Sequence, residues 1–93
     1  MNRDEAQSLL RVRVAELKAK SYPELKALLN NPECFEAKAG SGQIYQIEWE
    51  AFWESAREGN LKIIASIDDG KLSSSIVPIT LAFVVTPGGK ILD

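Results

Sequence analysis

The sequence predicts an α+β domain in which an N-terminal helix, followed by a short second helix, packs on one face of a four- to five-stranded antiparallel meander sheet. Apolar residues recur with a period of about 3.6 over residues 1–30 and of about 2 from residue 33 onward. Glycine- and proline-containing turn signals divide the second region into consecutive strands. Because 93 residues are too few for two cores, we expect one domain over 1–93, helical in 1–30 and sheet in 33–93.

A long helix is predicted for residues 3–20, because its apolar positions fall at spacings of four, four and three along one face. These positions are Ala6, Leu10, Val14 and Leu17. The segment "SYPE" predicts a second helix over 22–29. Ser21 and Glu24 have the capping-box spacing, and Pro23 is tolerated in a first turn. The "NNP" that follows ends this helix.

Alternation predicts which side chains of each strand face the helices. In "QIYQIEWEAFWE" the inward set is Tyr45, Ile47, Trp49, Ala51 and Trp53. In "LKIIASID" it is Leu61, Ile63, Ala65 and Ile67. In "SIVPITLAFVV" it is Val77, Ile79, Leu81, Phe83 and Val85, with Pro78 favouring an edge, a bulge or a break. We expect Trp49 and Trp53 to lie beneath the N-terminal helix.

The side chains also predict how the strands are aligned. Pairing Ser55 with Leu61 places Trp49 opposite Ile67, whereas a slip of one residue would place Trp49 opposite Asp68. The pattern therefore favours the first register for this hairpin.

Two further turns complete the predicted sheet. The turn at 40–42 pairs Phe35 with Ile47 in the first hairpin. The "PGG" at 87–89 is the last turn, and residues 90–92 are expected to add a short terminal strand.

The residue types present exclude several chemistries. The chain has no histidine and one cysteine, which removes the Ser-His and Cys-His nucleophile arrangements and the usual zinc sites. A Ser-Lys pair from Lys71 and residues 73–75 is conceivable, but serines after a turn are usually loop residues. Asp68 and Asp69 precede a glycine and favour a turn, because neighbouring strand residues point to opposite faces. We therefore lean away from an enzyme and expect no cofactor and no bound metal.

The candidate site residues lie on both faces of the predicted sheet. Glu48, Glu50 and Asp68 should cluster on its outer face, close enough to share a hydrated divalent cation or to attract a basic partner. The alternative is a solvated face whose acidic side chains discourage edge aggregation. Tyr45 and Trp49, together with nearby acids, would line a ligand pocket between helix and sheet, or else simply form core.

Charge and hydropathy restrict the partners. The net charge is −2, and residues 31–59 carry six acidic and two basic residues, so nucleic acid is not expected to bind. The longest apolar stretch, 76–85, is too short for a membrane helix, and the N-terminus shows no signal segment. One cysteine requires no oxidising compartment, and we expect a cytoplasmic protein. A stripe on the first helix offers either a homodimer contact or a plain solvent face: Ser8, Val12, Ala15 and Ala19.

Four segments of the chain are informative together: "SYPEL" (21–25), "YQIEWEAFW" (45–53), "GNLKIIASIDDG" (59–70) and "PGG" near the end. With these segments the chain resembles a group of small bacterial α+β proteins that have no assigned activity. In such proteins an aromatic residue and an arginine are expected soon after the Asp-Gly turn, where this chain has "KLSSSIVPIT". The resemblance implies one α+β domain and no particular function.

Two functional hypotheses follow from these observations. The first is a non-enzymatic protein–protein interaction module that uses the acidic outer face or an edge strand. The alternative is a small-ligand binder or weak enzyme with an aromatic pocket between helix and sheet.

Overall fold

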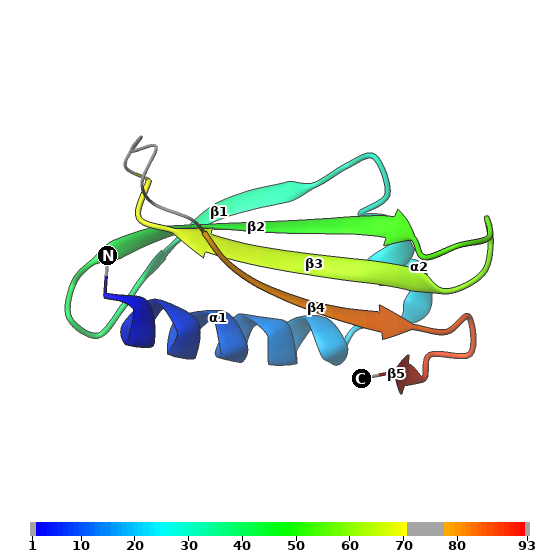
Figure 1. Cartoon of the computed structure of the whole chain (residues 1–93), viewed down its shortest axis with the longest axis horizontal. Coiled ribbons are helices and arrows are strands. Elements are labelled where there is room, and N and C mark those ends of the chain that lie inside the picture. Colours follow the sequence, from blue (N-terminus) through cyan, green and yellow to red (C-terminus); the bar gives the residue numbers. More distant parts are fainter. Residues whose placement is uncertain (1, 71–77, 93) are drawn as a thin grey trace.

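The computed structural model describes residues 2–70 and 78–92 and confirms the α+β fold. Two helices precede five strands, which form one antiparallel sheet in chain order (Figure 1). The elements are α1 (Arg3–Lys18), α2 (Tyr22–Lys26), β1 (Glu33–Lys38), β2 (Ile44–Trp53), β3 (Leu61–Asp68), β4 (Ile79–Val85) and β5 (Ile91–Leu92). Within the described residues, no helix is long and apolar enough to cross a membrane.

Both helices begin at side-chain caps. The Asn2 side chain accepts a hydrogen bond from the Glu5 N–H at the start of α1. Ser21 and Glu24 form the predicted capping box of α2, and the hydrogen bonds from Ser21 hold the pKa of Glu24 below its usual value. Each helix ends two or three residues earlier than predicted, because its last N–H groups bond to the carbonyl three residues back rather than four.

The core lies between the helices and one face of the sheet. The predicted α1 stripe is buried, and so are the predicted inward residues of β3. In β2, Tyr45, Ile47, Trp49 and Ala51 are buried, but Trp53 is only half-buried. In Figure 1, α1 runs alongside β3 and β4, the strands that it contacts most. The expectation that both tryptophans lie beneath α1 is therefore wrong for Trp53, whose ring lies 5.7 Å from the Lys26 ammonium of α2.

The register of the second hairpin differs from the prediction by two residues. Trp53 pairs with Leu61 and Trp49 with Ala65, whereas the sequence placed Trp49 opposite Ile67. A shift of two keeps every side chain on its predicted face, so alternation alone does not distinguish the two registers. The loop decides: Glu58 takes a left-handed conformation (φ 65°), and the Glu54 N–H bonds to the Asn60 carbonyl at 2.9 Å.

The helix α2 holds this loop in place from the side. The Tyr22 hydroxyl donates a hydrogen bond to the Gly59 carbonyl at 2.8 Å, and the Lys26 ammonium lies 2.6 Å from the Glu58 carboxylate. These two contacts join residues far apart in the sequence, so the alternation of side chains within β2 and β3 does not reveal them.

The first hairpin has the predicted register, with Phe35 opposite Ile47. The last turn is also confirmed, since Gly89 has a φ of 88° and residues 91–92 form β5. The predicted inward position of Val77, and the Ser-Lys candidate of Lys71 and residues 73–75, fall outside the described residues. The α1 stripe considered for a dimer is solvent-exposed, and Val12 is 58% exposed.

One carboxylate connects the start of α1 to the sheet. Glu5 Oε1 accepts hydrogen bonds from the Tyr45 hydroxyl (2.9 Å) and from the Ser41 hydroxyl (2.8 Å). Burial of the ring, and next the hydrogen bond to Glu5, raise the pKa of Tyr45. The three side chains connect α1, β2 and the turn between β1 and β2.

This connection is tested by a double-mutant cycle on Tyr45→Phe and Glu5→Ala. We expect a coupling free energy of about 1 kcal/mol from urea unfolding, because the cycle isolates a hydrogen bond to a charged acceptor. The matched control is Tyr22→Phe with Glu5→Ala, whose effects should be additive since Tyr22 bonds to Gly59 instead. Additivity in the Tyr45 cycle would show that this contact does not stabilise the fold.

Candidate functional site

The outer face of the sheet is the surface on which the sequence placed its acidic candidates. Both helices pack against the inner face (Figure 1), and among the described residues no element covers the outer one. Strand β2 crosses this face with one row of alternate side chains: Ile44, Gln46, Glu48, Glu50 and Phe52. Ile44 and Phe52 are each 47% exposed. The row is thus apolar at its two ends and acidic at its centre.

A hollow of about 220 Å³ lies over this row. It is bordered by Cys34, Gln46, Ile47, Glu48, Ser66, Asp68 and Pro78. Two of the predicted site residues, Glu48 and Asp68, therefore border the same hollow. The predicted register placed Glu48 directly opposite Asp68, but the structure does not. Ser66 pairs with Glu48, and Gln46 pairs with Asp68. The two carboxylates are diagonal neighbours across β2 and β3.

The third acidic candidate, Glu50, contacts Glu48 rather than the hollow. A hydrogen bond between the two carboxyl groups, and next partial burial, raise the pKa of Glu50. Within the described residues, neither carboxylate forms an ion pair with a lysine or arginine. The pair is a concentration of negative charge that binding of a cationic group would relieve.

The thiol of Cys34 also borders the hollow, next to Glu48. It donates a hydrogen bond to Glu48 Oε2 at 3.3 Å from the neighbouring strand β1. That hydrogen bond is the main cause of a raised pKa for Cys34, followed by burial and the charges of Glu48 and Glu50. A thiol held in its protonated form is a poor nucleophile, so the arrangement does not activate Cys34.

The carboxylate of Asp68 has a structural task as well. Its Oδ1 accepts a hydrogen bond from the Gly70 N–H at 2.7 Å, and Gly70 has a φ of 74°. The predicted turn after β3 is thus confirmed for the described part of this segment. One oxygen of Asp68 holds the turn while its side chain borders the hollow.

A metal ion is the weaker of the two interpretations of this face. In the described ranges, no group of three or more histidine, cysteine, aspartate or glutamate side chains is arranged to hold one. Of the predicted residues, only Glu48 and Asp68 meet at the hollow. Two carboxylates at a surface hollow fit a lysine or arginine side chain, which needs fewer ligands than a bound ion.

The two aromatic candidates lie on the opposite face. Tyr45 is fully buried and Trp49 is 8% exposed, with Phe35 packed edge-on against Trp49 at 4.8 Å. The indole N–H of Trp49 is buried and has no hydrogen-bond partner in the described part of the chain. Neither ring borders the outer-face hollow. The structure therefore does not bring Tyr45 and Trp49 together with Glu48, Glu50 and Asp68.

Sequence reasoning missed Cys34 and Ser66 as parts of this site. Cys34 follows from the first hairpin, because pairing Phe35 with Ile47 also pairs Cys34 with Glu48. The position of Ser66 depends on the second hairpin, whose register was wrong by two residues.

Comparisons with protein-family models, curated proteins and solved structures found no match. The resemblance to small bacterial α+β proteins therefore stays a prediction, and the function is argued from the geometry alone.

The contact between Glu48 and Glu50 predicts a pH-dependent gain in stability for Glu50→Gln. The native state holds the Glu50 proton more tightly than the unfolded chain, so ionisation above the raised pKa disfavours folding. At pH 7 we expect Glu50→Gln to raise Tm by about 2–4 °C, a gain of up to about 0.5 kcal/mol. The difference should disappear below pH 4, where both proteins are neutral at this position.

The matched control is Glu36→Gln, which removes the same charge from the outer face of β1. Glu36 pairs with Gln46 and not with a carboxylate, so its Tm should change little. An equal gain from both variants would mean that general charge reduction, rather than the Glu48–Glu50 contact, causes the effect.

The Cys34–Glu48 hydrogen bond predicts slow alkylation of the thiol. The midpoint of the iodoacetamide rate against pH should lie above the usual thiol value, and Glu48→Gln should lower it, because the replacement removes a negative charge beside the thiolate. At pH 8 the variant should react several-fold faster than the unmodified protein, while Glu36→Gln should differ little. A midpoint unaffected by Glu48→Gln would contradict the contact.

Proposed function

We propose that this protein is a non-enzymatic interaction module that binds a basic, partly apolar segment of another protein on the outer face of its sheet. The observation that carries this proposal is the row along β2. Glu48 and Glu50 lie in contact at its centre, with exposed Ile44 and Phe52 at its ends. A segment with two basic side chains between two apolar ones matches this order.

The geometry of extended chains makes the match specific. Same-face residues two apart are roughly 7 Å from each other in a strand. Glu48, Glu50 and Phe52 therefore follow one another at this interval, and Gln46 separates Glu48 from Ile44. The hollow bordered by Glu48 and Asp68 accepts one basic side chain beside the row. Each exposed ion pair contributes only about 0–1 kcal/mol, so burial of Ile44 and Phe52 supplies much of the affinity.

The charge pattern supports a positive rather than a negative partner. The hydrogen bond to Glu48, and next partial burial, raise the pKa of Glu50, and a cationic group beside Glu50 favours its ionised form and so lowers that pKa. Binding is thereby coupled to ionisation of Glu50. Affinity should therefore rise with pH through the raised pKa and fall with salt.

The alternative of a small-ligand pocket between helix and sheet rests on Tyr45 and Trp49. Its one favourable feature is the buried Trp49 N–H, which has no acceptor within the described residues. The Tyr45 hydroxyl is already bonded to Glu5. A thermal-shift screen against metabolites tests this alternative, and stabilisation by several degrees with one compound class would support it.

The proposal is tested by NMR titration of the ¹⁵N-labelled protein with the capped peptide Leu-Ser-Lys-Ser-Lys-Ser-Gln-Ser-Leu, whose Gln lies opposite Gln46. We expect amide shifts concentrated in β2 and β3, and at least a fivefold weaker affinity for Glu48→Lys/Glu50→Lys. The matched control, Asp4→Lys/Glu33→Lys, changes charge equally at the start of α1 and at the start of β1 and should bind like the unmodified protein. Equal loss in both variants, or shifts that do not include β2, would contradict a site on this face.

A further inference from the structure

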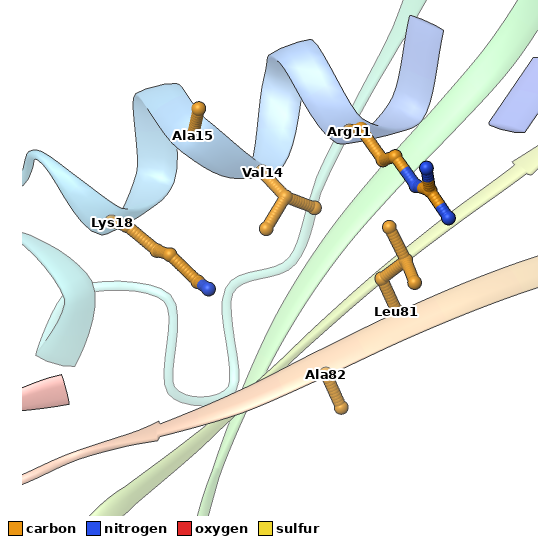
Figure 2. Close-up of a pocket in the computed structure, with 6 residues that line it drawn as sticks. All are labelled: Arg11, Val14, Ala15, Lys18, Leu81 and Ala82. Carbon is orange, nitrogen blue, oxygen red and sulfur yellow. The ribbon is translucent and has the colours of Figure 1, made fainter. Parts of the chain in front are cut away.

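A second surface, of opposite charge, lies where α1 meets the outer edge of β4. A hollow of about 230 Å³ is bordered there by Arg11, Val14, Ala15, Lys18, Leu81 and Ala82. Figure 2 shows Val14 and Leu81 pointing toward each other from helix and strand, with the long side chains of Arg11 and Lys18 on either side. This surface shares no residue with the outer-face hollow.

The backbone beside this hollow has unpaired hydrogen-bonding groups. Strand β5 pairs only with Val84 and Val85, so in the described residues β4 has no neighbour on that side over residues 79–83. Thr86 donates its N–H to the Lys90 carbonyl at 2.9 Å, which points Thr86 toward β5. Because the N–H and C=O groups alternate in direction along a strand, those of Thr80 and Ala82 point to the same side, beyond the end of β5.

The sequence of β4 does nothing to protect this edge. Its seven residues, ITLAFVV, include no charged side chain and no proline, which are the usual means of preventing strand addition. By contrast β1, at the other edge, contains Glu33, Glu36 and Lys38. The two edges therefore differ, and β4 is the one prepared to accept another strand.

The cations on α1 determine what kind of strand fits. Arg11 and Lys18 are separated by roughly 10 Å along the helix, with the apolar surface of Val14 and Leu81 between them. Among the described residues Arg11 has no ion pair, and the Lys18 ammonium lies 5.6 Å from the Phe83 ring centroid. Inward side chains of an added strand occur every two residues, so two acidic residues four apart, with an apolar one midway, match this spacing.

We propose that the β4 edge binds an extended partner segment of the pattern acidic–x–apolar–x–acidic, which adds to the sheet as a further strand. Its backbone bonds to the outward groups of Thr80 and Ala82, its central apolar side chain fills the hollow against Val14 and Leu81, and its two carboxylates pair with Arg11 and Lys18. Strand addition supplies affinity through the backbone, and the helix flank supplies specificity. This inference is independent of the outer-face proposal, because it uses another surface and a partner of opposite charge.

The test is NMR titration with the capped peptide Ser-Glu-Thr-Leu-Thr-Glu-Ser. Amide shifts are expected in β4 and along residues 11–18 of α1, and intermolecular nuclear Overhauser contacts should connect the peptide to β4. Arg11→Glu/Lys18→Glu should weaken binding at least fivefold. The matched control Lys38→Glu/Arg57→Glu, which changes charge equally on β1 and the loop after β2, should leave the affinity unchanged.

A backbone variant separates strand addition from simple charge attraction. Ala82→Pro removes an outward N–H at an edge, where proline is tolerated, and should weaken peptide binding at least fivefold with circular dichroism unchanged. If Ala82→Pro does not fold, nuclear Overhauser contacts between the peptide and Thr80 or Ala82 in the unmodified protein decide the question.

Three results would overturn the proposal. The first is amide shifts confined to elements other than β4 and α1. The second is equal affinity of Arg11→Glu/Lys18→Glu and Lys38→Glu/Arg57→Glu for the peptide. The third is a dimer in sedimentation velocity that Arg11→Glu/Lys18→Glu dissociates, because a second copy of the chain would then occupy the edge. Glu48→Lys/Glu50→Lys should bind this acidic peptide normally, so failure here and failure of the outer-face proposal are distinguishable.

Discussion

The rest of this structure depends on the burial of one face of the sheet, and only one. Leu10 and Leu17 of α1 pack in the same core as Ile63 and Ile67 of β3, all with almost no exposed surface. Since side chains alternate across a strand, burial of this set fixes the direction of every neighbouring side chain. Glu48 and Glu50 face water because Trp49 does not. The position of the acidic row is thus a consequence of the core rather than a separate feature.

The same constraint separates charge across the molecule. Residues 1–30, which contain both helices, carry six of the eleven lysine and arginine residues, and the helices cover the inner face. Glu48 and Glu50 of β2 remain on the outer face. Arg11 and Lys18 of α1 instead border the hollow beside β4. One fold therefore presents an acidic face and a basic-flanked edge, and each of the two proposals uses one of these surfaces.

Much of the fold could be predicted because it follows from local periodicity and turn chemistry. The α1 stripe, the capping box at Ser21 and the turn at Gly70 are each set by residues a few positions apart. The register of β2 with β3 could not be predicted, because alternation specifies register only to within two residues. The loop between these strands fixes the register, and its position depends on the distant contact of Tyr22 with Gly59. The contact of Glu5 with Tyr45 joins residues forty positions apart. Of the candidate site, the acidic face was predictable, but which acids meet at one hollow depended on that register.

The most direct test of a single buried face is the solvent accessibility of isoleucine methyl groups. Ile63 and Ile64 are neighbours in β3, but Ile63 is fully buried whereas Ile64 faces outward. Methyl-labelled NMR with a soluble paramagnetic gadolinium complex measures both in one spectrum. The structure predicts strong relaxation enhancement for Ile64 and Ile44, and little for Ile63, Ile47 and Ile67. Equal enhancement of Ile63 and Ile64 would contradict the separation of faces on which the outer-face site depends.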